Sequence, residues 1–152
     1  MASFYLLNQF VRQNDLRPAD VIVVKKAPLG LLSHYVVFLG HDSYGQPVFM
    51  ASLNLGIKIL TPDLLQKFQA YLNPVRIRRF QGTERQREQA VGRALQRRDE
   101  SSYNLLVNNC EHFANYVQKG QAFSQQSQVA GLALVLALFA ILFSPQEEEE
   151  NY

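Results

Sequence analysis

The residue in this chain best suited to chemistry is its single cysteine. Cys110 stands in the stretch Asn108 to Phe113, and the apolar side chains that follow recur at helical spacing. A cysteine in the first turn of a helix meets the positive end of the helix dipole and unpaired backbone N–H groups, which lower the thiol pKa and can bind an oxyanion. The sequence therefore predicts a reactive thiolate. The alternative is a buried small hydrophobic residue, the usual state of a free cysteine.

A histidine far upstream supplies the base that such a thiol needs. His34 begins the apolar run Tyr35 to Leu39, where a polar side chain is unexpected unless it has a partner. An imidazole that takes the thiol proton is a common way to activate a cysteine nucleophile. Catalytic partners are neighbours in space rather than in sequence, so the long separation does not count against this pair.

The overall composition limits the classes of protein to consider. A chain of 152 residues holds one domain of ordinary size, and 47% hydrophobic with 18% charged residues is typical of a globular protein. One cysteine rules out an intramolecular disulfide, which favours a cytosolic setting. A net charge of +2 does not indicate nucleic-acid binding, and the N-terminus lacks the basic segment of a secretory signal peptide.

Apolar periodicity predicts the elements that must position Cys110 and His34. We expect helices over 3–14, 62–71, 83–98 and from Cys110 to Gly120, and strands over 21–24, 34–40, 47–53, 56–60 and 75–80. Turn-forming residues over 41–46 join two of these strands into a hairpin. His34 thus stands at the start of a strand, and Cys110 stands at the start of a helix.

The C-terminal part of the chain differs from the rest. A polar linker over 124–128 precedes an apolar stretch over 129–143, and an acidic tail over 144–152 closes the chain. As a helix the stretch would extend about 22 Å, short of the ~30 Å hydrocarbon core, so it would span with local thinning of the bilayer. A buried core helix is the alternative. The polar flanks favour a membrane anchor attached to a catalytic domain over 1–123.

A basic stretch lies between Arg76 and Arg98. It contains eight arginines against Glu84 and Glu88. Such a run is usually a solvated face, and the alternative is attraction to anionic lipid headgroups, worth about 1 kcal/mol for each basic residue near the surface. If the C-terminal helix spans the membrane, these arginines and Lys119 predict that the catalytic domain faces the cytoplasm.

Several motifs resemble one known family, the lecithin:retinol acyltransferases, in particular the phospholipase A/acyltransferase branch. The matching residues are Asn109 to Phe113 with Asn115 and Lys119-Gly120, Arg17 to Asp20, and His34 to Gly40. The resemblance covers roughly residues 16 to 143. It implies an α+β, circularly permuted papain-like fold, with an antiparallel sheet packed on helices and the nucleophile at a helix N-terminus. It also implies that Cys110 takes an acyl chain as a thioester and that His34 is the general base.

The third polar residue of the family does not match. A histidine on the next strand usually orients the first, and Met50 stands near its position here. Methionine cannot hold an imidazole by a strong hydrogen bond. Ser52, Asn54 or His41 are the candidate substitutes, although His41 in the turn is better explained as a solvated residue. His112 is better explained by packing than by catalysis.

The leading hypothesis is a membrane-anchored thiol phospholipase A/acyltransferase that acts on a glycerophospholipid and passes the acyl chain to water or an acceptor. One alternative is a cysteine peptidase or amidase, because related permuted folds cleave cell-wall peptides. The other is a non-enzymatic or weakly active membrane-remodelling or interaction protein on the same fold. We expect no cofactor, no metal and no nucleic acid.

Overall fold

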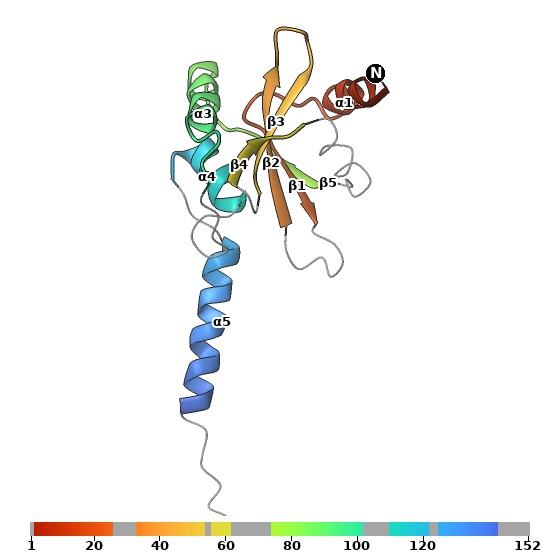
Figure 1. Ribbon diagram of the computed structural model, residues 1–152. Helices are drawn as coiled ribbons and strands as arrows, with labels where there is room; N and C mark the ends of the chain where they lie inside the picture. Colours follow the sequence, from red (N-terminus) through yellow and green to blue (C-terminus); the bar gives the residue numbers. More distant parts are fainter. Residues whose placement is uncertain are drawn as a thin grey trace, which may run out of the picture.

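Five short strands and four helices make up the computed structural model, which describes residues 2–25, 33–53, 56–61, 74–101, 110–121 and 125–142 (Figure 1). The helices are α1 (Ala2–Gln13), α3 (Glu84–Gln96), α4 (Cys110–Lys119) and α5 (Gln125–Leu142); the strands are β1 (Val21–Lys25), β2 (Ser33–His41), β3 (Pro47–Leu53), β4 (Gly56–Ile59) and β5 (Pro74–Arg78). The predicted α+β class is confirmed. The helix expected over 62–71 lies outside the described residues.

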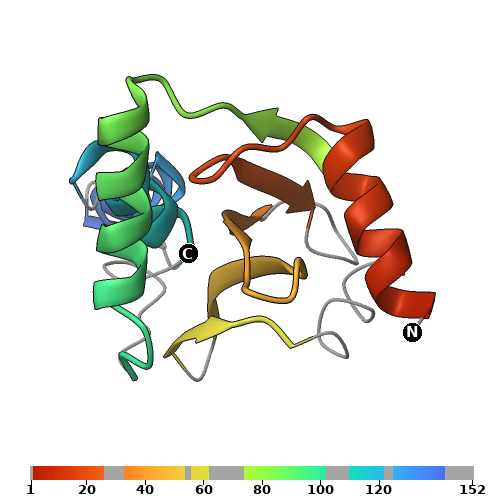
Figure 2. The same cartoon turned by 90° about the horizontal axis from the view of Figure 1, so that it is seen from above.

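The strands form one antiparallel sheet in the order β4-β3-β2-β1-β5. Helix α1 covers one face of the sheet, and α3 and α4 lie on the other side (Figure 2). This arrangement confirms the prediction of an antiparallel sheet packed on helices. The central strand is β2, and His34 near its start pairs with Val24 of β1.

Both faces of the sheet are buried. The α4-side core joins alternate strand residues to α3 and α4, and includes Val23, Tyr35, Val37, Met50 and Phe113. The α1-side core takes the other alternate residues, Ile22, Val24, Val36, Phe38, Phe49 and Ala51, together with Leu7 and Val11 of α1. Burial on both faces explains why these strands read as continuous apolar runs rather than as alternating patterns.

The predicted hairpin between β2 and β3 is confirmed. The Asp42 side chain accepts hydrogen bonds from the backbone N–H groups of Tyr44 (2.9 Å) and Gln46 (2.8 Å). Gly45 has a φ of +72°, a conformation that costs glycine little. A carboxylate that bonds to the backbone two residues on is a common way to close such a turn.

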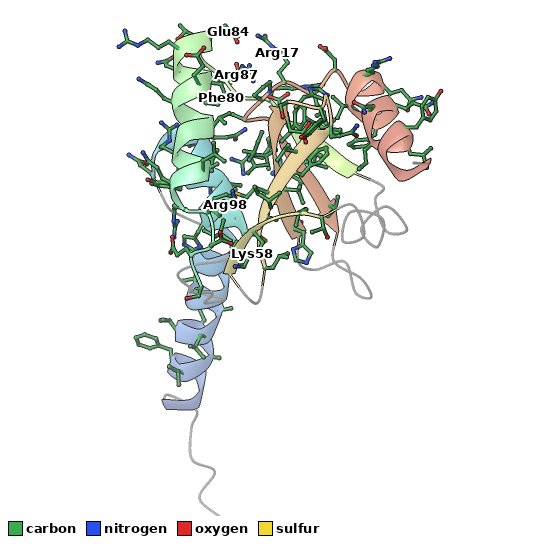
Figure 3. All side chains as sticks on the ribbon, turned by 45° about the horizontal axis from the view of Figure 1, so that its top comes forward. Arg17, Lys58, Phe80, Glu84, Arg87 and Arg98 are labelled. Carbon is green, nitrogen blue, oxygen red and sulfur yellow. The ribbon has the colours of Figure 1, made fainter. Side chains whose placement is uncertain are left out.

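A buried carboxylate ties together the segments around the start of β1. Asp20 is 1% exposed, and its Oδ1 accepts from the Phe80 backbone N–H at 2.9 Å and from Arg87 Nη1 at 3.4 Å. Its Oδ2 accepts from the Arg17 backbone N–H at 3.1 Å and from Arg79 Nη1 at 3.0 Å. Arg87 also stacks on the Phe80 ring, 5.2 Å from its centroid (Figure 3). The four residues that bond to Asp20 lie before β1, after β5 and on α3.

Helix α5 extends away from the domain (Figure 1). It begins at Gln125, so it takes in four of the five residues predicted to form the linker over 124–128. Its described apolar side chains are largely exposed, with Val129 at 67% and Leu132 at 61%. Within the described residues no helix is both long and apolar enough to span a bilayer, so the membrane-spanning helix predicted over 129–143 is not confirmed.

Removal of the Asp20 charge should destabilise the whole domain. Asp20→Asn puts an amide N–H donor where Arg79, Arg87 and two backbone N–H groups already donate. We expect a loss of about 3–5 kcal/mol in the free energy of unfolding, the usual cost of removing one partner of a buried ion pair. Urea unfolding followed by circular dichroism measures this loss.

The matched control is Asp99→Asn, because Asp99 pairs with Lys58 at the surface, at 3.0 Å. This control should leave the unfolding midpoint almost unchanged. Equal losses of unfolding free energy in the two variants would show that the Asp20 cluster stabilises the fold no more than a surface ion pair does.

Candidate active site

The sulfur of Cys110 lies against the start of β2. Its Sγ donates to the carbonyl oxygen of Ser33 at 3.5 Å, and the backbone N–H of Tyr35 is directed at the sulfur. Cys110 is the first residue of α4 and is 6% exposed. The thiol therefore contacts the main chain immediately before and immediately after His34.

This contact is possible because β2 and β3 separate at one end. Their pairing ends at Val36 opposite Ala51, whereas β3 continues beside β4 as far as Leu53. On the other edge of β2, Phe38 exchanges backbone hydrogen bonds with the segment before β1, at 2.7 and 2.9 Å. Backbone groups alternate between the two edges along a strand. Those of Ser33 and Tyr35 therefore point into the gap between β2 and β3, and the sulfur occupies that gap.

His34 is half-buried and lies opposite Val24 of β1. Cross-strand partners share a face, which gives His34 the face of Val24 and Val36 on the α1 side. Cys110 packs in the α4-side core, so α4 brings the sulfur to β2 from the face opposite to that of His34. The fold thus places the sulfur beside the main chain next to His34.

The resting thiol is not the stabilised thiolate that the helix position predicts. Burial raises the pKa of Cys110 above its ordinary value, and the negative charge of Glu111 adds to this effect. The backbone N–H groups of Tyr35, Cys110 and Glu111 lower the pKa without reversing the change. The expectation of a lowered pKa is therefore wrong, because loss of hydration outweighs the backbone amides. The sulfur needs a base at the moment of attack.

Among the candidates for the third polar residue that the structure describes, Ser52 lies nearest to this end of the sheet. It is fully buried, and pairing with Ile57 places it on the α4 side, one residue beyond the last β2–β3 pair. Within the part of the chain that the structure describes, its Oγ has no hydrogen-bond partner. A buried hydroxyl without a partner is costly and is uncommon away from functional sites.

The other candidates differ sharply in position. His41 is exposed at the far end of β2, where its ring meets Phe38 edge-on with centroids 5.6 Å apart. It stands eight positions along β2 from Ser33, about 26 Å at 3.3 Å per residue, so it is remote from the thiol. Met50 is fully buried in the α4-side core and serves packing. Asn54, and Asn108 and Asn109 immediately before α4, lie outside the described residues.

The role expected for His112 agrees with its surroundings. It is 7% exposed in the first turn of α4, and burial lowers its pKa despite the charge of Glu111. A lowered imidazole pKa favours the neutral form at physiological pH. Burial therefore favours the neutral form of His112, two residues after Cys110.

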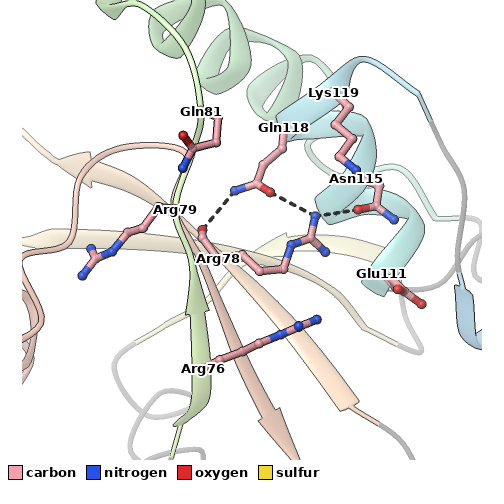
Figure 4. Close-up of a pocket in the computed structure, with 8 residues that line it drawn as sticks. All are labelled: Arg76, Arg78, Arg79, Gln81, Glu111, Asn115, Gln118 and Lys119. Atoms are coloured by element: carbon pink, nitrogen blue, oxygen red, sulfur yellow. Dashed lines mark hydrogen bonds between the residues drawn. The ribbon is translucent and has the colours of Figure 1, made fainter.

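A basic pocket on the neighbouring surface was not predicted as a site. It has a volume of about 390 Å³ and lies between β5 and α4 (Figure 4). The residues that line it are Arg76, Arg78, Arg79, Gln81, Glu111, Asn115, Gln118 and Lys119. The sequence signal was the basic stretch that begins at Arg76, but only the fold places its first arginines beside α4.

Comparison with known protein families matches residues 14–123 to the family described as lecithin retinol acyltransferase. The match extends over most of the chain and includes both His34 and Cys110. The chain belongs to the lecithin retinol acyltransferase family. Comparisons with curated proteins and with solved structures give no match. Membership of the lecithin retinol acyltransferase family is consistent with acyl transfer and agrees with the resemblance found in the sequence.

The raised thiol pKa can be tested directly, because the chain has one cysteine. The rate of Cys110 alkylation by iodoacetamide should rise with pH through a higher midpoint in the native protein than in the urea-unfolded protein. The reason is that burial disfavours the thiolate in the native state alone. Mass spectrometry of the adduct over time gives both profiles. A native midpoint at or below the unfolded one would mean that the backbone N–H groups lower the thiol pKa by more than burial raises it.

Proposed function

We propose that this protein is a thiol acyltransferase of phospholipase A type, which takes an acyl chain from a glycerophospholipid. The observation that carries the proposal is the contact of Cys110 Sγ with the main chain on both sides of His34. In this proposal His34 acts as the base and the backbone N–H groups near the sulfur bind the oxyanion, which together supply the groups that acyl transfer requires.

The reaction follows from these groups in two steps. In the first, His34 takes the thiol proton as the Cys110 sulfur attacks the ester carbonyl carbon, and the N–H groups near the sulfur stabilise the oxyanion. The ester C–O bond then breaks, the lysophospholipid oxygen takes the proton from His34, and a thioester remains. In the second, His34 takes a proton from water or an acceptor, which attacks the thioester. The acyl product leaves, and the sulfur regains its proton through His34.

The raised pKa of Cys110 supports this order of events. A resting thiolate–imidazolium pair would need a lowered thiol pKa, whereas the burial of Cys110 raises it. The proton is therefore transferred during the attack, as in general-base catalysis. Ser52 lies on the α4 side rather than on the face of His34, so we assign its unpartnered hydroxyl to the oxyanion and not to the orientation of the imidazole.

Membrane association forms the second part of the proposal. The exposed apolar side chains of α5 suit contact with lipid, from which the substrate comes. In this proposal α5 anchors the protein at the membrane, and the catalytic domain lies on the cytoplasmic side. A second candidate function is a weakly active or non-enzymatic lipid-remodelling protein. The deep burial of Cys110 and the presence of Met50 in place of a polar residue favour that candidate.

The decisive experiment incubates purified protein with phosphatidylcholine vesicles and measures fatty acid, lysophospholipid and an acyl adduct on Cys110. Wild-type protein should give all three, and Cys110→Ala should give none. His34→Gln should slow adduct formation about 100- to 10,000-fold, the usual contribution of a general base. Wild-type protein that yields neither adduct nor product would favour the non-enzymatic candidate. Product release by Cys110→Ala would exclude the cysteine mechanism.

Ser52 offers a variant that separates stability from activity. Ser52→Ala removes a buried hydroxyl that has no partner, so the free energy of unfolding should stay the same or rise slightly. Acyl transfer should fall about 100-fold if the hydroxyl stabilises the oxyanion. The matched control is Ser43→Ala in the exposed β2–β3 turn. An unchanged rate of acyl transfer in Ser52→Ala would contradict a role for Ser52 in stabilising the oxyanion.

A further inference from the structure

The basic pocket between β5 and α4 is lined by more cations than carboxylates. Four cations line it, and one of them, Arg79, turns away to Asp20 and to the backbone carbonyl of Asp15 (Figure 4). Arg76, Arg78 and Lys119 remain, and Glu111 is the one carboxylate among the lining residues. An excess of cations in a concave site attracts an anion.

Arg78 is held in place by neutral groups. Its Nη2 donates to Asn115 Oδ1 at 2.6 Å and to Gln118 Oε1 at 3.0 Å, and its guanidinium lies 5.6 Å from the centroid of the Tyr35 ring. Gln118 is itself fixed, because its Nε2 donates to the carbonyl oxygens of Ala19 and Arg78. These amides orient the guanidinium without cancelling its charge, which is the preorganisation that phosphate recognition uses.

Burial adds a reason for an anion at this point. Desolvation lowers the pKa of Arg78 from its ordinary value, which means that the folded protein bears a cost for this charge. Asn115, which holds the guanidinium, is 2% exposed, so the site is built from buried parts rather than from loose surface side chains. An anion bound to Arg78 would offset part of that cost.

From these observations we infer that the basic pocket binds the phosphate of an anionic phospholipid. The inference rests on the proposed function and names the headgroup class of its substrate. Glu111, Asn115 and Lys119 share one face of α4, the helix that begins at Cys110. A phosphate in the pocket therefore lies beside the helix that carries the nucleophile. A volume of about 390 Å³ is within the range of small-ligand sites, large enough for a headgroup.

Binding is best measured without turnover, on the full chain that carries Cys110→Ala. Vesicles of phosphatidylcholine alone, or mixed with phosphatidylglycerol, are sedimented with the protein. Arg78→Gln in this background should weaken binding to the mixed vesicles about tenfold, the weight of a charge-assisted hydrogen bond. Arg76→Gln, at an exposed residue, should weaken it in the same direction without altering the fold, and Glu111→Gln should strengthen it.

The matched control is Arg85→Gln, an exposed residue of α3 outside the pocket. Equal losses for Arg85→Gln and the two pocket variants would indicate diffuse attraction and overturn the inference. Inorganic phosphate should displace the protein from the mixed vesicles. Phosphate binding that depends on Arg78, with no preference for phosphatidylglycerol, would assign the pocket to a free phosphate and overturn the lipid assignment.

The binding result stays separate from the proposed catalysis. Wild-type protein that binds the mixed vesicles through Arg78 but forms no thioester would support the phosphate site and contradict the acyltransferase proposal. In the opposite case, Arg78→Gln leaves both vesicle binding and acyl transfer unchanged on both types of vesicle. That result would contradict the phosphate site and remain compatible with the acyltransferase proposal.

Discussion

The buried carboxylate of Asp20 is the interaction on which the rest of the domain depends. It fixes the start of β1, the chain after β5 and the side of α3 through Arg87. Helix α3 packs with α4 in the α4-side core, and β1 sets the register of β2 through the pairing of Val24 with His34. One ionised group in the interior is costly, so its four donors must all be in place. The positions of both proposed catalytic residues follow from that requirement.

The gap between β2 and β3 imposes a compromise on the thiol. Insertion of Cys110 beside Tyr35 gives the sulfur a fixed position and backbone donors, and it also removes water from the sulfur. Water loss is the larger effect on the thiol pKa. The sulfur is therefore well oriented, but less of it is present as the reactive thiolate. The proposed chemistry accordingly depends on a base that acts during the attack. The same burial protects the thiol from adventitious oxidation.

Local patterns predicted the strands well because both faces of the sheet are buried. The run over 47–53 was predicted with the bounds it has, and the start of α4 at Cys110 agrees as well. The direction of the thiol pKa shift could not be predicted, since it depends on contact with Ser33, 77 residues away. The basic pocket was missed for a similar reason. Arg78 meets Asn115 only through tertiary packing, and the residue pattern along β5 does not show that α4 lies beside this strand.

The hydrogen bond from Cys110 Sγ to the Ser33 carbonyl links the chemical state of the sulfur to the main chain. A thiol has a proton to donate, whereas a thiolate or a thioester has none. Each change of state at the sulfur therefore adds or removes one donor at the backbone carbonyl immediately before His34. Acylation of the sulfur would therefore remove one hydrogen bond from the first peptide group of the strand that carries the proposed base.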